Sequence, residues 1–210
     1  MPADSTEIAL IRHFPTDWNR EQRLQGRADR PLTADARARL AELRLPRPWD
    51  RAAIVASTLC RARETAESLA EGRPVQLDAR LVEQDWGDWE GLIGEALLAD
   101  PASGFVATHL MGPDFRPPNG ETARDVLARV RPALAGIGGS GRRTLLVVHK
   151  AVMRHLMREA HGLPAEAEAP EIKRARLYPM RCDAQGRLSD PAAPMRLVPR
   201  REAARDGAAP

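Results

Sequence analysis

Three short apolar runs, bounded by polar residues or by glycine and proline, stand out along the chain. They cover residues 7–12, 53–57 and 144–148. Runs of this length are typical of strands buried in a sheet, because amphipathic helices need about ten residues or more. The sequence therefore predicts three buried strands.

Helical spacing separates these runs. Thr33 and Thr122 can cap two of the helices, and Asp125 completes a capping box with Thr122. Pro132 is predicted to kink or end its helix, because proline lacks the N–H that the helix needs. Strands that alternate with helices predict an α/β fold with a parallel sheet. The apolar residues at intervals of three and four lie within residues 36–43, 62–69, 126–134 and 152–160.

The junctions after the three strands are where a site is expected, since ligands of such sheets bind beyond the carboxyl ends of the strands. Two segments fall outside the alternation. Residues 100–120 are rich in proline and glycine and are predicted to form a loop or lid over the site. Residues 186–210 are predicted to be an extended tail beyond a single domain of residues 1–185.

The composition fits one globular domain. The 210 residues are 43% hydrophobic and 29% charged, with a formal net charge of +3, which excludes a collagen-like or wholly disordered chain. Lys150 and Lys173 are the only lysines, so arginine supplies 30 of the 32 basic residues. These arginines are scattered, which argues against a nucleic-acid partner, and guanidinium groups bind phosphate well through paired hydrogen bonds.

Nothing in the sequence suggests export or a membrane. Asp4 and Glu7 precede the first apolar run, which is unlike a signal peptide. The longest aliphatic run, residues 145–148, is far shorter than the ~20 residues of a membrane span. Cys60 and Cys182 form no C-x-x-C pair or disulfide framework. We therefore expect a reduced, cytoplasmic protein with no membrane partner.

Several common catalytic motifs are absent. The G-x-G-x-x-G at residues 136–141 follows a helix and precedes a strand, the reverse of a dinucleotide site. The sequence has no P-loop, no D-x-D pair, no cysteine followed six residues later by arginine, and no H-x-x-x-H pair for zinc. These absences direct attention to the strand ends.

Two of the three strand ends lead directly into histidine. His13 follows Arg12, His149 follows the last strand, and Arg61 follows the middle one. If the strands are neighbours, these side chains form a compact cationic pocket that suits an anion. A lone histidine at a strand end more often hydrogen-bonds to a carbonyl group, but two histidines with two arginines favour the anion site.

These residues also lie in five ordered motifs that resemble those of the histidine phosphatase superfamily. The resemblance spans about residues 7–160. It implies the phosphoglycerate mutase-like fold, a three-layer α/β/α arrangement with a mostly parallel, mixed sheet. The residues around 117–122 look most like the α-ribazole phosphatase branch. The motifs are RHFPTDWN at 12–19, STLCRARETA at 57–66, LVE and WGDWEG within 81–91, NGET at 119–122 and LVVH at 146–149.

The resemblance implies a role for each matching residue. His13 would be the nucleophile that forms a phosphohistidine, and Arg12, Arg61 and His149 would bind the phosphoryl oxygens. Glu83 would protonate the leaving group, which requires a carboxyl group kept partly protonated by burial. No metal or other cofactor is expected, and the substrate would be a small phosphorylated metabolite. Asn19 is the expected additional phosphate donor, with Gln25 and Gly26 at the pocket rim.

Two residues depart from the family pattern. Phe14 and Lys150 each stand where the family usually has glycine after a site histidine. Phe14 adds bulk beside His13 and is predicted to be a hydrophobic wall for the substrate. Lys150 lies at a helix N-terminus, where the helix dipole disfavours a cation; either an anionic substrate offsets this cost or Lys150 is a solvated surface residue.

Three functions are consistent with this pattern. We favour a phosphomonoester hydrolase, because only about 30 residues separate Trp89 from Glu121 and the resemblance to mutases would imply a longer insertion. The alternatives are a phosphoglycerate mutase and a catalytically weak regulatory or binding protein. Trp86 and Trp89 are predicted to be packing residues, and His109 is a weaker candidate for substrate contact. The oligomeric state is expected to be monomer or homodimer.

Overall fold

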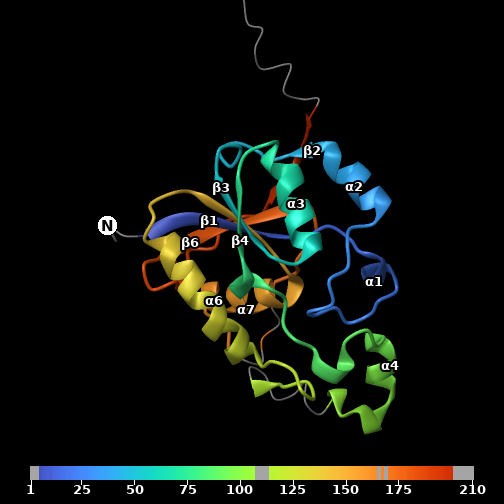
Figure 1. Cartoon of the computed structure of the whole chain (residues 1–210). Coiled ribbons are helices and arrows are strands. Elements are labelled where there is room, and N and C mark those ends of the chain that lie inside the picture. The colour runs from blue at the N-terminus through green and yellow to red at the C-terminus, as the bar shows by residue number, and fades with distance from the viewer. Residues whose placement is uncertain (1–4, 107–113, 165–166, 168–169, 201–210) are drawn as a thin grey trace, which may run out of the picture.

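The computed structural model of the protein describes residues 5–106, 114–164, 167 and 170–200. A mixed, mostly parallel sheet lies at its centre (Figure 1). Within the described residues, the sheet has seven strands, in the order β4-β3-β5-β1-β6-β7 with β8 also paired to β6. The first four of these strands are parallel, and β6, β7 and β8 join them by antiparallel pairing. The strands are β1 (Ser5–Arg12), β3 (Ala53–Ser57), β4 (Val75–Asp78), β5 (Thr144–Val148), β6 (Arg176–Asp183), β7 (Leu188–Ser189) and β8 (Met195–Arg196).

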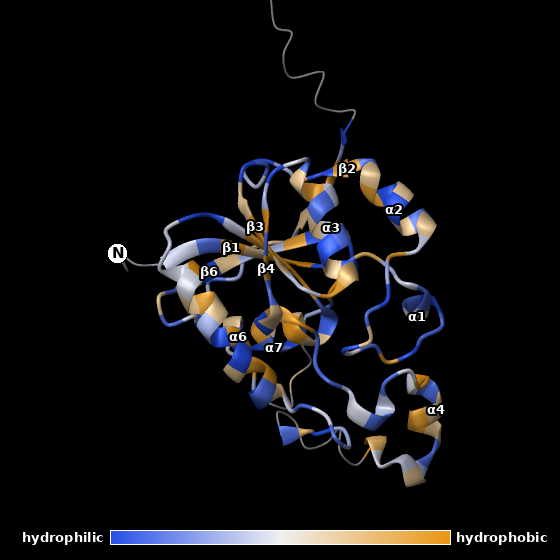
Figure 2. Ribbon diagram, viewed as in Figure 1, coloured by the Kyte–Doolittle hydropathy of each residue, from blue (hydrophilic) through white to orange (hydrophobic). Residues whose placement is uncertain are grey.

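Helices cover both faces of the sheet. Alternate strand residues point to opposite sides: Ile11 and Val147 join the core beneath α2 (Ala34–Ala41) and α3 (Cys60–Ala70). Leu10 and Val148 join the core beneath α6 (Ala123–Gly138) and α7 (Lys150–Ala160). Figure 2 shows the hydrophobic colour concentrated on these central strands. This is the predicted three-layer α/β/α fold, and none of the helices described is long and apolar enough to cross a membrane.

The predicted helix starts are confirmed. Of the two outcomes predicted at Pro132, an end of the helix is wrong, and a kink stays a prediction. Thr33 caps α2, and Thr122 with Asp125 forms the capping box of α6. However, α6 continues through Pro132 to Gly138. Proline removes one backbone hydrogen bond, but buried side chains on both sides of it, including Val130 and Leu134, pack against the sheet and maintain the helix.

A smaller apolar cluster lies beside the sheet, around α4 (Gly94–Ala99), which is at the lower right of Figure 1. It is built from Trp89, Leu97, Phe105 and Phe115. The short helices α1 (Asp17–Arg20), η1 (Ala79–Leu81), η2 (Gly87–Trp89) and η3 (Pro101–Ser103) complete the connections. Within the predicted lid segment 100–120, Phe105 and Phe115 therefore belong to a packed cluster, and a lid function stays a prediction.

The C-terminal residues are more ordered than the sequence predicts. β7 and β8 pair with β6, and β9 (Val198–Pro199) pairs with β2 (Leu43–Arg44). The predicted extended tail from residue 186 is therefore wrong for residues 188–199, whereas residues 201–210 lie outside the described part. Each of these strands has two residues, too few for an alternating pattern to be visible in the sequence.

Candidate active site

The carboxyl ends of β1, β5 and β3 bring two histidines and two arginines together. Because these strands are parallel neighbours, the residues that follow them meet at one edge of the sheet. The backbone N–H of His13 donates to the carbonyl oxygen of Val148 at 3.0 Å. The ring centroids of His13 and His149 are 5.2 Å apart. Arg61 lies in the first turn of α3 and is fully buried.

The hydrogen bonding of His13 fixes which ring nitrogen is free. Nδ1 lies 2.7 Å from the carbonyl oxygen of Phe14, and since a carbonyl oxygen only accepts, Nδ1 carries the proton. Burial, together with the positive charges of Arg61 and Arg12, lowers the pKa of His13 well below its usual value. His13 is therefore neutral near pH 7, with an electron pair on Nε2.

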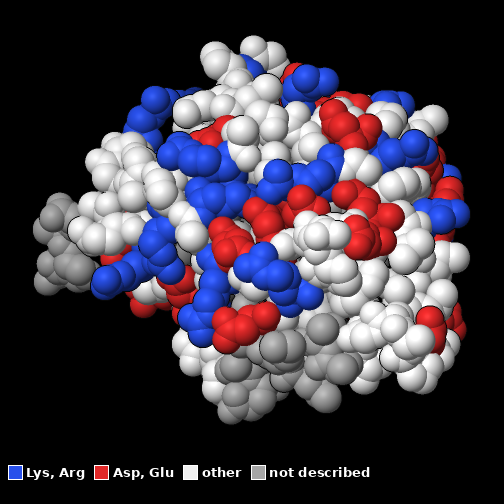
Figure 3. Space-filling model, turned by 60° about the horizontal axis from the view of Figure 1, so that its bottom comes forward, with Lys and Arg blue, Asp and Glu red and all other residues white. Residues whose placement is uncertain are grey.

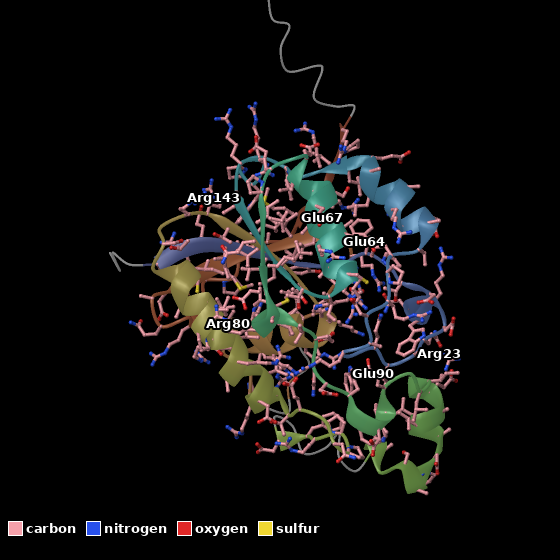
Figure 4. The ribbon with its side chains drawn as sticks, viewed as in Figure 1. Arg23, Glu64, Glu67, Arg80, Glu90 and Arg143 are labelled. Atoms are coloured by element: carbon pink, nitrogen blue, oxygen red, sulfur yellow. The ribbon has the colours of Figure 1, made fainter. Side chains whose placement is uncertain are left out.

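Arg61 is held in place by main-chain carbonyl groups. Nη1 donates to the oxygen of Ala28 at 2.9 Å and Nη2 to that of Gly26 at 2.7 Å. Oε1 of Glu90, labelled in Figure 4, accepts hydrogen bonds from the N–H groups of the same two residues, at 3.0 Å from Gly26 and 2.6 Å from Ala28. Gly26 is required sterically, because a Cβ atom there would lie 2.6 Å from the carbonyl oxygen of Gln84. Glu90 thus positions the loop that orients Arg61.

Several buried nitrogen atoms at this edge have no partner. Among the described residues, Nε of Arg12, Nε of Arg61 and both ring nitrogens of His149 make no hydrogen bond. Burial and the charge of Arg174 lower the pKa of Arg12 to about 10. Burial, Arg61 and His13 lower the pKa of His149 well below its usual value. Unpaired buried donors are costly, and an oxyanion supplies the acceptors that they lack.

A cavity of about 590 Å³ opens at this edge of the sheet. Arg12 and His13 are part of its wall, whereas Arg61 and His149 are fully buried and are not part of it. The remaining wall residues combine cations, amides and apolar side chains. They are Asn19, Gln22, Arg23, Leu24, Gln25, Glu83, Trp86, Leu98, Phe105, Lys150, Ala151, Arg154 and Arg174.

Glu83 sits against the N-terminus of α7. Oε2 accepts from the N–H of Ala151 at 3.1 Å, and Oε1 accepts from Val152 at 3.2 Å and from Gln84 at 2.9 Å. The N-cap residue of the same helix is His149. The side chain of Glu83 is buried and faces the cavity.

Asn19 and Gln25 form a hydrogen-bonded pair in the cavity wall. Oε1 of Gln25 accepts from Nδ2 of Asn19 at 3.3 Å and from the Thr16 hydroxyl at 2.9 Å. Nε2 of Gln25 is buried without a partner among the described residues. Both residues therefore line the cavity, and their roles toward a phosphate group stay predictions. Gly26, predicted at the same rim, is not part of the cavity wall.

The two residues that depart from the family pattern, Phe14 and Lys150, lie in different environments. Phe14 is 2% exposed and belongs to the core beneath α2 and α3, and it is absent from the cavity wall. The predicted role of Phe14 as a substrate wall is therefore wrong, because its side chain packs into the interior. Its N–H donates to the hydroxyl oxygen of Thr65 at 3.1 Å. Lys150, in contrast, lies in the cavity wall.

Sequence reasoning missed two cations and part of the apolar wall. Arg154 lies four residues after Lys150, a spacing that places both on one helix face and that could have been noticed. Arg174 belongs to no motif and precedes β6. Trp86 packs in the small cluster as predicted, but it also lines the cavity. His109 lies outside the described residues.

Comparisons of the sequence with known proteins identify its relatives. A sequence profile of the histidine phosphatase superfamily (branch 1) matches residues 8–189. The probable phosphoglycerate mutase GpmB of Klebsiella pneumoniae is 38% identical over 168 residues, which cover 77% of this chain and 78% of that protein.

Solved structures show the same fold. YhfR of Bacillus stearothermophilus is 32% identical with a TM-score of 0.72, over 87% of this chain and 94% of that one. The mycobacterial glucosyl-3-phosphoglycerate phosphatase is 27% identical with a TM-score of 0.68, over 93% of this chain and 98% of that one. A putative α-ribazole-5′-P phosphatase from Escherichia coli is 24% identical and has a TM-score of 0.69, over 93% of this chain and 97% of that one. With its motifs, its sheet and a profile match over most of its length, this chain belongs to the histidine phosphatase superfamily.

Proposed function

We propose that the protein hydrolyses phosphomonoesters of a small metabolite through a phosphohistidine at His13, without a metal ion. The observation that carries this proposal is the state of the His13 ring: Nδ1 is bound to the Phe14 carbonyl, and no hydrogen bond to Nε2 is seen among the described residues. Unpaired buried nitrogen atoms of Arg12 and His149 lie at the same edge of the sheet. A neutral imidazole with a fixed tautomer is a competent nucleophile at neutral pH.

The reaction then has two steps. In the first, Nε2 of His13 attacks phosphorus, the N–P bond forms and the P–O bond to the leaving group breaks, while Glu83 donates a proton to the departing oxygen. In the second step, Glu83 takes a proton from a water molecule. The oxygen of that water attacks phosphorus, and the N–P bond breaks. Inorganic phosphate leaves and His13 is regenerated.

Charge stabilisation in both steps comes from the side chains around His13. Phosphoryl transfer depends mainly on positioning and on neutralising the equatorial oxygens. Arg12, Arg61 and His149 bring unpaired buried nitrogen atoms to this edge of the sheet, and guanidinium groups bind phosphoryl oxygens in a bidentate manner. Arg12 and Arg61 supply the positive charge that a metal ion supplies in other phosphatases, and the neutral ring of His149 supplies a hydrogen-bond donor.

A mutase is the second candidate, because curated relatives such as the Klebsiella protein are named probable phosphoglycerate mutase. A mutase must return the phosphoryl group to its product instead of passing it to water. Incubation with 3-phosphoglycerate separates the two: a hydrolase releases phosphate, whereas a mutase yields 2-phosphoglycerate.

The proposal is tested with p-nitrophenyl phosphate in the presence of a chelator. We expect turnover, and an acid-labile phosphoenzyme after rapid quenching. His13→Ala should abolish both, and His161→Ala, at the exposed C-cap of α7, should change neither. Failure of the unmodified protein to hydrolyse any phosphomonoester, with vanadate still bound, would instead support a regulatory or binding function.

A further inference from the structure

The outer part of the cavity carries more positive charge than one phosphate needs. Beyond Arg12, three cations lie in its wall, Lys150, Arg154 and Arg174. A fourth, Arg23, is already paired with Glu21 at 2.5 Å. The only carboxylate among the described wall residues is Glu83, whose two oxygens accept three backbone N–H groups.

The three outer cations have no acidic partner within the described residues. Many other arginines do: Arg80 and Arg143, labelled in Figure 4, pair with Asp78 and Glu7. Figure 3 shows basic and acidic residues side by side on one face of the molecule. The cavity thus concentrates cations without the counter-charges that this face has.

The cations repel one another. Burial, and then the charges of Arg12, Arg154 and Arg174, lower the pKa of Lys150. Arg174 is half-buried, donates from Nη2 to Oδ1 of Asn19 at 2.8 Å and leaves Nε buried without a partner among the described residues. Such an arrangement is unfavourable until an anion occupies it.

A single phosphoryl group does not account for this charge. Its oxygens are bound at the inner end by Arg12, Arg61 and His149 in the proposed function. Lys150 and Arg154 lie one helical turn apart on the same face of α7, so they face the cavity together. A second anionic group, apart from the transferred phosphate, would neutralise them.

Another part of the wall is apolar. Leu24, Trp86, Leu98 and Phe105 line the cavity together with these cations. Its volume of about 590 Å³ is in the range of pockets that hold ligands of drug size, well above what a three-carbon phosphate ester fills.

We infer that Lys150, Arg154 and Arg174 form a second-anion subsite, and that the substrate is a phosphomonoester whose apolar body carries a further carboxylate or phosphate group. This inference rests on the proposed function, since it identifies the class of ester that the same site hydrolyses.

A matched pair of synthetic esters tests the subsite. Carboxyphenyl phosphate and carbamoylphenyl phosphate, each as 3- and 4-isomers, differ in charge but little in size. We expect the unmodified protein to prefer the carboxylate in kcat/KM by about tenfold or more, the value of one charge-assisted hydrogen bond. The same ratio of kcat/KM is measured for phenylene bisphosphate and hydroxyphenyl phosphate. Comparison of the two ratios shows whether the subsite prefers a second phosphate group or a carboxylate.

The variants are Lys150→Gln, Arg154→Gln and Arg174→Gln. The ratio of kcat/KM for the charged and neutral esters should fall toward one in each, and the ratio cancels any general loss of activity. Arg154→Gln is the cleanest change, because no hydrogen bond or ion pair is seen for Arg154 in the described structure. Arg39→Gln, on the exposed side of α2, removes the same charge elsewhere and should leave the ratio unchanged.

The outcomes separate the subsite from the proposed function. Turnover of all esters with no preference for the second anion, or a preference that survives all three substitutions, overturns the subsite and leaves the phosphatase intact. Absence of turnover for every ester overturns the phosphatase itself. Thermal unfolding of each variant verifies that the fold is retained.

Discussion

The inner end and the outer wall of the cavity are built in different ways. At the inner end, His13, Arg61 and His149 follow parallel neighbouring strands and are almost completely buried. In the outer wall, Lys150 and Arg154 extend from exposed positions on α7. The inner end is fixed by the sheet, and the outer wall depends on long side chains. In the proposed function, chemistry and substrate choice therefore depend on structurally different parts of the site.

The largest expected effect is at the inner end. Arg61→Gln removes the buried guanidinium that the proposed function assigns to the phosphoryl oxygens, and loss of one such donor costs about 10³-fold in kcat. Steady-state assay with p-nitrophenyl phosphate measures it. The control is Arg63→Gln on the exposed side of the same helix, which should retain full activity. Comparable losses in both variants would contradict the assignment.

The substitution Glu83→Gln should cause the next largest loss of activity. Without the acid, kcat for an alkyl phosphate should fall by about 10²-fold, the usual contribution of a positioned proton donor. The loss for p-nitrophenyl phosphate should be smaller, since nitrophenolate leaves without a proton. Glu67→Gln on α3, exposed and labelled in Figure 4, is the control. An equal loss for both esters would rule out proton donation by Glu83.

Stability should depend on pH because of the buried histidines. The folded pKa values of His13 and His149 are lowered by burial, and that of His155 is lowered to about 4 by burial and the nearby arginines. Below about pH 6.5 the unfolded chain binds protons that the folded chain does not, so the free energy of unfolding falls by up to about 1.4 kcal/mol per pH unit for each histidine.

Urea unfolding between pH 7 and pH 5 measures this dependence. His13→Asn, whose amide can still donate to the Phe14 carbonyl, should give a shallower decline. A flat profile for the unmodified protein would show that these rings are protonated in the folded state and would remove the basis for a neutral nucleophile.

The smallest expected effect concerns Glu90, which positions the loop that binds Arg61. Glu90→Gln keeps an acceptor for the N–H groups of Gly26 and Ala28 but removes its charge, a change of about 1 kcal/mol. This corresponds to about a fivefold fall in kcat, with the preference for a second anion unchanged. A change in that preference with kcat intact would place Glu90 in the outer wall instead.

The sequence predicted the inner end well because strand order and position carry the information. Once β1, β3 and β5 are parallel neighbours, the residues after their carboxyl ends have to meet. The three predicted strands and the capped helices follow from local patterns that need no tertiary information.

The outer wall and the chain's C-terminal part could not be predicted in this way. Arg174 reaches the cavity from the segment before β6, and only the antiparallel addition of β6 to β1 brings it there. Phe14 follows a site histidine, and the sequence gives no indication that its ring turns into the core. Two-residue strands such as β9 exist only because a partner strand is present.

The first turn of α7 has a consequence for how this enzyme can change. His149 caps it, Glu83 binds its N–H groups, and Lys150 begins it. A rotation of that turn to admit a new substrate would displace the proposed phosphate ligand and proton donor at the same time. New selectivity is therefore accessible by exchanging side chains on a stationary helix, and an engineered library should vary positions 150 and 154 while leaving the backbone of α7 untouched.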